Sequence, residues 1–256
     1  MSLGNGDFVK ISYTGKLENG DVFDTTDIEV AKQHGIYAEG IDYNPIIVVV
    51  GENMVVTGLD EDLIGKEVGY EGTVVIPPEK AFGHRNPELV EVVPTRRFEK
   101  KPVPGMRVNV GNRTGTVESV VGGRVRVDFN LPYAGKTITY DYKIEKSVVN
   151  AISKIKGLIE YYMHKDFVVS KKGKIIRVEI PYEFAFNQTV QYYKGVLAEK
   201  IMRFIDVEGV EYVELHKKPP HAIEEAKSEV ADEREKPEEN AEKSDEDAAK
   251  VFPNNS

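Results

Sequence analysis

Residues 6–26, which read GDFVKISYTGKLENGDVFDTT, constrain the fold more than any other part of the chain. Tyr13 lies in a segment whose side chains alternate as in a half-buried strand. Residues 18–20, Glu-Asn-Gly, are a tight-turn signal, and Phe23 and Asp24 follow in the next strand. A hairpin with this register brings an aromatic side chain from each strand, together with one carboxylate, to the same end of a sheet.

The composition predicts a chain with a substantial hydrophobic core and no thiol chemistry. Of its 256 residues, 40% are hydrophobic and none is cysteine. This excludes disulfides, thiolate nucleophiles and zinc–thiolate sites, and it fits a reducing compartment. No apolar run approaches the roughly 20 residues of a transmembrane helix, and the first residues lack the apolar core of a signal peptide. We therefore expect a cytoplasmic protein.

The charge is unevenly distributed. The formal net charge is −9, and the segment after His221 holds 12 acidic and 5 basic residues, hence −7. The rest of the chain is nearly neutral, so there is no electrostatic reason to expect nucleic acid as a partner, and we expect no membrane partner either. Residues 218–256, rich in Glu, Lys and Ala, are predicted to be disordered or a solvated helix.

Changes of pattern along the chain predict three folded parts. Residues 1–83 and 131–149 read as strands wrapped on a short helix, which Thr57 is expected to cap. The loop from Asp27 to Asn44 holds a further short helical pattern, which Gly35 closes. Residues 84–130 hold short alternating strands punctuated by glycines and read as a small β-rich insert. Residues 150–217 read as a compact α+β domain.

In this last domain, Asn150 and Asn187 are each expected to cap a helix. The apolar stripe of the second helix, from Val190 to Phe204, is interpreted as core, with a dimer face as the alternative. If the stripe is a dimer face, the protein would form a homodimer through its C-terminal domain.

The hairpin resembles the opening of FKBP-type peptidyl-prolyl isomerases, whose motif is YTG-x-L-x-[DN]-G-x-x-FD. The match continues through VVVGENMVVTGLDEDLIGKEVGYEGTVVIPPEKAFG and TITYDYKIE. The insert resembles the insert-in-flap chaperone domain of SlyD-like members, and the C-terminal domain resembles that of longer archaeal members, where it is linked to self-association. The resemblance implies an α+β fold with an antiparallel sheet wrapped on a short helix, an inserted β-rich domain and a C-terminal α+β domain.

The resemblance also implies a pocket in which an X-Pro peptide bond rotates. Its catalytic residues would be Tyr13, Phe23, Asp24, Val55, Val56, Leu59, Phe82 and Tyr140. Ile46 and Val48 lie on the pocket strand, Tyr140 replaces a family Phe, and Leu59 would be the floor. Substrate-binding residues would be Ile46, Leu131 and Tyr133 at the pocket, and Leu89, Val90, Val92, Val93 and Phe98 in the insert.

Three features depart from the family pattern. The usual N-H-P-L-A-G-K reads NLPYAGK here, so Leu131 replaces a histidine of the pocket rim. Leu59 replaces a Trp found in some relatives, which weakens the expected affinity for macrolide inhibitors. The tail has His221 but no cysteine, so the nickel binding of SlyD proteins is not expected. We expect no metal and no cofactor.

Rotation of an X-Pro bond needs no acid, base or nucleophile. The barrier of about 18–20 kcal/mol reflects amide resonance, which the twisted state loses. An apolar pocket favours this less dipolar state, and a reduction of about 4 kcal/mol gives roughly three decades of rate. Tyr13 and Asp24 would supply the few polar groups that orient the peptide. The activity is expected to be independent of pH from about 5.5 to 8.5 and insensitive to chelators.

Each residue also has a purely structural interpretation. The apolar pocket residues could be ordinary core, Asp24 a turn former, and Tyr13 a strand aromatic. The apolar residues of the insert could form its own core rather than a surface for unfolded clients. The functional alternative to an isomerase is a non-catalytic holdase that binds unfolded polypeptides. The complete set of pocket residues favours the isomerase, with proline-containing polypeptides as partners.

Overall fold

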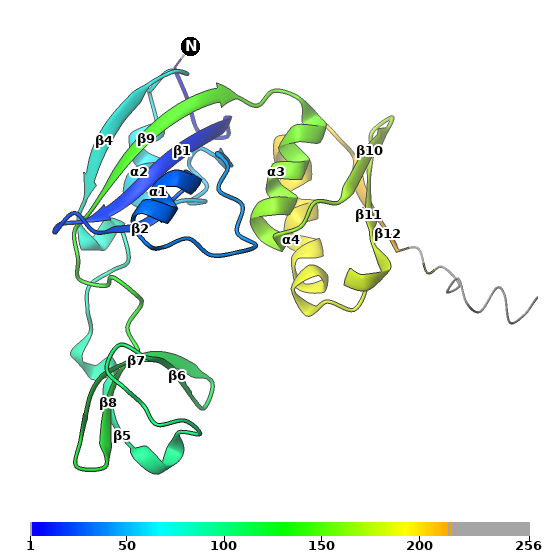
Figure 1. Ribbon diagram of the computed structural model, residues 1–256. Helices are drawn as coiled ribbons and strands as arrows, with labels where there is room; N and C mark the ends of the chain where they lie inside the picture. Colours follow the sequence, from blue (N-terminus) through cyan, green and yellow to red (C-terminus); the bar gives the residue numbers. More distant parts are fainter. Residues whose placement is uncertain (1, 215, 217–256) are drawn as a thin grey trace, which may run out of the picture. The chain divides into compact units, whose positions relative to one another are not determined.

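The computed structural model describes residues 2–214 and 216. The chain is an α+β protein, as predicted, and Figure 1 shows sheets in three successive parts of the described chain. The predicted tail, residues 218–256, lies outside the described residues. No helix among residues 2–214 is both long and apolar enough to cross a membrane.

The first sheet is antiparallel and is centred on the hairpin strand. β1 pairs with β9 along one side, and its other side is shared between β3 and β2, while β4 pairs with the far side of β9. The strands are β1 (Phe8–Leu17), β2 (Val22–Thr25), β3 (Ile46–Val49), β4 (Glu71–Ile76) and β9 (Ile138–Ser147). The predicted hairpin is present, and Gly20 turns it with a φ of 87°.

Helix α2 (Thr57–Leu63) packs directly on this sheet. A Cβ at Gly58 would lie 2.5 Å from Ile76 of β4, so the glycine permits the close approach. The predicted cap was wrong by one residue. Val56 occupies the N-cap position with extended backbone, so Thr57 is already helical. Helix α1 (Ile28–Gln33) precedes β3, and the short 3₁₀ helix η1 (Pro78–Lys80) follows β4.

A buried carboxylate holds the turn between β3 and α2. Asp60, which is 3% exposed, accepts hydrogen bonds from the backbone N–H groups of Gly51 (2.9 Å) and Asn53 (2.8 Å). The turn runs directly into Val55 and Val56, so this network fixes where the two valines lie.

The insert forms its own antiparallel sheet in the order β5-β8-β7-β6. The strands are β5 (Val90–Pro94), β6 (Arg107–Val110), β7 (Arg113–Val121) and β8 (Arg124–Asp128), with the 3₁₀ helices η2 (Pro87–Leu89) and η3 (Thr95–Arg97) at the ends of β5. Its core consists of five valines: Val93, Val108, Val117, Val125 and Val127. β5 was not predicted, because Pro87 just before it and Pro94 at its last position resemble loop punctuation.

The C-terminal part combines two helices with a three-stranded sheet. Its elements are α3 (Ala151–Met163), β10 (Val168–Lys172), β11 (Ile175–Ile180), η4 (Tyr182–Phe184), α4 (Gln188–Phe204) and β12 (Gly209–Glu214). β11 pairs antiparallel with β10 and parallel with β12, across the α4 connection. Both predicted caps are confirmed, since Asn150 accepts from the Ser153 N–H and Asn187 from the Val190 N–H, each at 3.1 Å.

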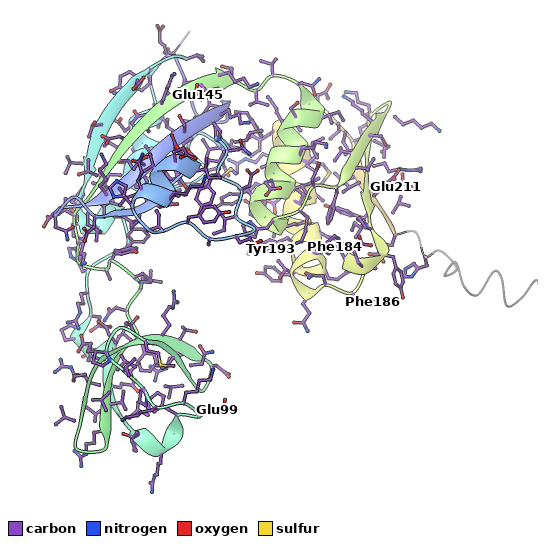
Figure 2. All side chains as sticks on the ribbon, in the orientation of Figure 1. Glu99, Glu145, Phe184, Phe186, Tyr193 and Glu211 are labelled. Carbon is purple, nitrogen blue, oxygen red and sulfur yellow. The ribbon has the colours of Figure 1, made fainter. Side chains whose placement is uncertain are left out.

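The apolar stripe of α4 is core. Val190, Leu197 and Ile201 are at most 1% exposed within the chain itself, so the alternative of a dimer face on this stripe was wrong. Large aromatic side chains do reach the surface nearby. Phe186, labelled in Figure 2, is 78% exposed, and Tyr192 is 74% exposed.

Candidate active site

Five aromatic rings converge at one end of the first sheet. Phe23 is central, with ring centroids 5.8 Å from Tyr140, 5.9 Å from Phe82 and 4.8 Å from Tyr133. Tyr13 meets Tyr140 edge-on at 5.4 Å. These separations are those of favourable aromatic pairs. The structure therefore brings together four predicted catalytic residues and one predicted substrate-binding residue.

Gly15 makes room for this cluster. In the sheet it lies opposite Asp24 on β2 and opposite Tyr140 on β9. A Cβ at this position would lie 2.8 Å from the Phe23 ring and 2.9 Å from the Tyr140 ring. Sequence reasoning assigned Gly15 no role, although a glycine inside a strand is a signal of close approach.

The aliphatic candidates lie around the start of α2 and on β3. Leu59 is fully buried, as a pocket floor would be, while Val55 and Val56 are half-buried against the same core. Ile46 is half-buried at the start of β3, opposite Ile11. Val48, further along β3, is also fully buried.

At the rim, Tyr133 reaches the cluster and Leu131 does not. Leu131 is 66% exposed, whereas Tyr133, two residues later, makes ring contacts with Phe23 and Phe82. Tyr133 has a φ of 65°, a conformation uncommon outside glycine. The loop is tied to the residue after Phe82 by the Gly135 N–H, which donates to the Gly83 carbonyl at 2.7 Å.

The polar members of the site form a pair. The Tyr13 hydroxyl donates to Asp24 Oδ2 at 3.0 Å. Burial raises the pKa of Asp24 above its ordinary value, and the bond from Tyr13 acts in the opposite direction. Burial and the neighbouring Asp24 charge both raise the pKa of Tyr13 and that of Tyr140. The two phenols therefore stay protonated at physiological pH and can donate hydrogen bonds.

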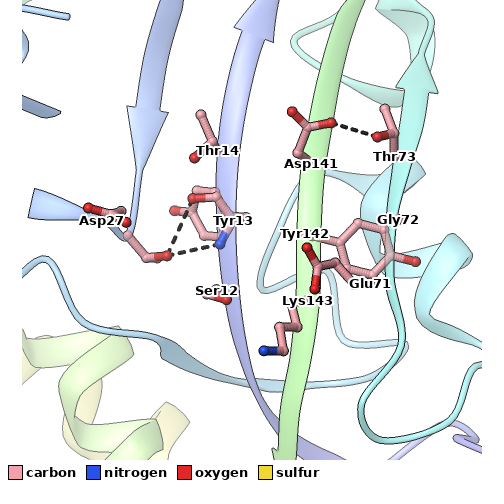
Figure 3. A pocket seen from close by; sticks show the side chains of 11 residues that line it. Ser12, Tyr13, Thr14, Asp27, Glu71, Gly72, Thr73, Asp141, Tyr142 and Lys143 are labelled. Carbon is pink, nitrogen blue, oxygen red and sulfur yellow. Dashed lines mark hydrogen bonds between the residues drawn. The ribbon is translucent and has the colours of Figure 1, made fainter. Parts of the chain in front are cut away.

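A concavity of about 530 Å³ lies elsewhere on the first sheet and has a different character. It is lined by residues 12–14 of β1, 71–73 of β4 and 141–143 of β9, together with Thr26 and Asp27 (Figure 3). Hydrogen bonds from Lys16 and Thr73 lower the pKa of Asp141. A surface this polar does not suit a prolyl ring. Among the described residues, no group of three or more His, Cys, Asp or Glu side chains could hold a metal ion.

The predicted client-binding residues of the insert divide into two sets. Val92 and Leu89 are exposed, by 61% and 37%, and Val90 is half-buried. Val93 is only 5% exposed and Phe98 is packed against the valine core. Including Val93 in the binding surface was therefore wrong, because alternation along β5 turns it inward.

Three family models match successive parts of the chain. The family model described as FKBP-type peptidyl-prolyl cis-trans isomerase matches residues 2–97. Two more, described as FKBP26, IF domain, and FKBP26_C-terminal, match residues 91–133 and 152–217.

Curated relatives match somewhat more than half of the chain. A short-type peptidyl-prolyl cis-trans isomerase of Methanocaldococcus jannaschii is 37% identical over 54% of this chain and 90% of its own length. A probable FKBP-type 16 kDa isomerase of Pseudomonas fluorescens is 30% identical over 56% and 89%. The SlyD isomerase of Treponema pallidum is 31% identical over 56% and 77%.

The aromatic cluster, the hairpin and these similarities define a prolyl isomerase. The chain belongs to the FKBP-type peptidyl-prolyl cis-trans isomerase family, with SlyD-like and archaeal short-type relatives.

Proposed function

We propose that the aromatic cluster is the place where the X-Pro bond rotates. The observation that carries this is the convergence of rings from β1, β2, β9 and both segments flanking the insert around Phe23. The residues that would act on the peptide are Tyr13, Phe23, Asp24, Val55, Val56, Leu59, Phe82 and Tyr140, with Ile46, Leu131 and Tyr133 touching the substrate.

The chemistry needs only this environment. The twisted amide is less dipolar than the planar amide, so apolar walls stabilise it relative to the ground state. About 4 kcal/mol of such preference would give roughly three decades of rate. The Tyr13–Asp24 pair would orient the chain without exchanging a proton with it.

We further propose that the insert holds unfolded clients, which would make the protein a chaperone as well as an isomerase. Val92 and Leu89 are exposed, and Val103 and Val121 are 53% and 74% exposed. The basic residues Arg96, Arg97, Lys100 and Lys101 are exposed close by in the sequence. Such a surface can bind many apolar and acidic segments weakly, and holding a client there raises the local concentration of its prolyl bonds at the pocket.

Deletion of the insert tests this role. Residues 84–130 can be replaced by a short loop, because Gly83 and Gly135 are hydrogen-bonded neighbours. Turnover of a prolyl tetrapeptide should stay within a few-fold of wild type. Catalysis of proline-limited protein refolding and suppression of aggregation should fall far more. A parallel fall of both activities in a folded variant would show that the insert is part of the pocket wall instead.

Point variants test whether the exposed apolar side chains of the insert bind clients. Val92→Ser together with Leu89→Ser should weaken aggregation suppression and leave peptide turnover unchanged. Val149→Ser removes an equally apolar side chain that is 85% exposed outside the insert, so it should change neither. Equal effects of the two sets would contradict a specific client surface. If the wild-type protein suppresses aggregation but does not catalyse turnover of the prolyl peptide, the non-catalytic alternative would be favoured.

Three further proposals concern the whole protein. The folded domains would be three: residues 1–83 with 131–149, residues 84–130, and residues 150–217. The absence of cysteine supports a cytoplasmic location. A homodimer through the C-terminal domain would use an exposed aromatic surface such as Tyr192, not the buried stripe of α4. Light scattering should then give twice the chain mass, and Tyr192→Ser should lower it. A monomeric mass at high concentration would exclude the dimer.

A further inference from the structure

Tyr140 is a buried phenol in a fixed position inside the aromatic cluster. It is 5% exposed and lies on β9 between Gly15 of β1 and Val74 of β4. Its ring is held edge-on by Tyr13 and by Phe23. The ring therefore has little freedom to turn away from the cluster.

The hydroxyl of Tyr140 has no hydrogen-bond partner among residues 2–214 and 216. The Tyr13 ring contacts the Tyr140 ring, but the Tyr13 hydroxyl donates its hydrogen bond to Asp24. On the same strand, the Tyr142 side chain is similarly buried, but its hydroxyl donates to Asp62. Among the described residues, Thr95 Oγ1 is the one buried side-chain polar atom that lacks a partner, so the unbonded Tyr140 hydroxyl reaches solvent at the edge of the cluster. A hydroxyl that is bonded only to water in the free protein can exchange that bond for one to a ligand.

The chemistry of the substrate identifies that partner. Proline has no backbone N–H, so an X-Pro unit offers carbonyl oxygens, which only accept hydrogen bonds. An ionised Asp24 is also only an acceptor and cannot bind them. The site therefore needs a donor, and Tyr140 provides one that is not already in use. The adjacent Asp24 charge and burial keep this phenol protonated.

We propose that the Tyr140 hydroxyl donates a hydrogen bond to a carbonyl oxygen of the bound X-Pro segment. The inference rests on the proposed prolyl site and adds a polar contact to a residue whose ring otherwise acts as an apolar wall. The carbonyl is present in both the planar and the twisted peptide, so the bond holds the substrate in both states. It therefore contributes to affinity and does not change the rotation step.

Tyr140→Phe tests the proposal, because it removes one oxygen atom and keeps the ring. We expect KM for a prolyl tetrapeptide, measured by NMR exchange on the full chain, to rise about five-fold with kcat unchanged. Chemical denaturation should show that stability is the same or higher, since no internal hydrogen bond is lost.

Tyr142→Phe is the matched control on the same strand. It removes a phenol oxygen that is bonded inside the protein, so it should lower stability and leave KM unchanged. Wild-type KM and kcat in Tyr140→Phe would overturn the proposal, as would a fall in kcat at constant KM. Failure of the proposed site itself would look different: Phe82→Ala would then also retain full activity.

Discussion

The Tyr13 hydroxyl lies 3.0 Å from Asp24 Oδ2 and donates a hydrogen bond to it across the first hairpin. The bond joins the two polar groups of an otherwise apolar cluster and fixes the direction of the carboxylate. It also means that Tyr13 is not available as a donor to the substrate while this pair is intact. The titration of the site therefore depends on Asp24 alone at acidic and neutral pH.

The first prediction concerns the pH dependence of catalysis. The raised pKa values of Tyr13 and Tyr140 keep both phenols protonated, so kcat/KM should be constant from about pH 7 to 9. On the acid side, activity should decline as Asp24 becomes protonated, at a pH above that of an ordinary aspartate. Protease-free assays with circular-dichroism checks of folding would measure this. A bell-shaped profile with an alkaline limb below pH 9 would point to acid–base chemistry.

The second prediction concerns stability. Because the folded-state pKa of Asp24 is raised, the folded protein binds this proton more tightly than the unfolded chain does. Its contribution to the free energy of unfolding is therefore present below about pH 4 and is lost as the pH rises through the folded pKa. Asp24→Asn should be more stable than wild type at pH 7, and the difference should vanish at low pH.

Denaturant titrations at several pH values would measure this difference. Asp206 is the control with the opposite sign, because Lys174 lowers its pKa. Asp206→Asn should therefore bring no gain at neutral pH. Equal stability of Asp24→Asn and wild type at pH 7 would contradict the assigned burial of this carboxylate.

The third prediction concerns the space at Gly15. Gly15→Ala should displace the rings of Phe23 and Tyr140, since its Cβ would lie within 3 Å of both. We expect kcat/KM for a prolyl peptide to fall at least ~10-fold, about 1.4 kcal/mol. Gly195→Ala is the control, because a Cβ there meets nothing within 4 Å on α4. That helix should gain up to about 1 kcal/mol without a change in activity. Unchanged activity of Gly15→Ala would contradict the tight packing.

The fourth prediction concerns the ring of Phe82, which contacts both Phe23 and Tyr133. Phe82→Ala should lower peptide isomerisation at least ~10-fold, or about 1.4 kcal/mol, because one wall of the cluster is removed. Val75→Ala is a suitable control, as Val75 lies on β4 and is 64% exposed. Similar effects of the two substitutions would point to general destabilisation and not to the site.

The sequence predicted best those features that depend on neighbouring residues. The hairpin turn at Gly20 and the caps at Asn150 and Asn187 have local chemical signatures, and all three are present. Thr57 also had the right chemistry for a cap, but Val56 occupies the N-cap position, and the helix begins at Thr57 itself, one residue earlier than predicted.

What the sequence did not reveal depends on contacts between distant segments. Val93 and Val92 have the same chemistry, and only the pairing of β5 with β8 decides which one is buried. The parallel pairing of β11 with β12 joins strands separated by a whole helix. For the same reason, the contact of Tyr133 with Phe23 and the open hydroxyl of Tyr140 could be found only in three dimensions.

Two asparagines, Asn86 and Asn130, are hydrogen-bonded to each other at the two ends of the insert. The Asn86 N–H donates to Asn130 Oδ1 at 2.8 Å, and Asn130 Nδ2 donates back to the Asn86 carbonyl at 2.9 Å. The segments that lead into and out of the insert are thus held together here and at the Gly135–Gly83 hydrogen bond. The entropy of closing a loop between such fixed ends rises only slowly with its length. The 86–130 segment is therefore a natural cassette. Modules of other sizes could be exchanged here without rebuilding the first sheet, and if the insert binds clients as proposed, such an exchange would change the range of clients.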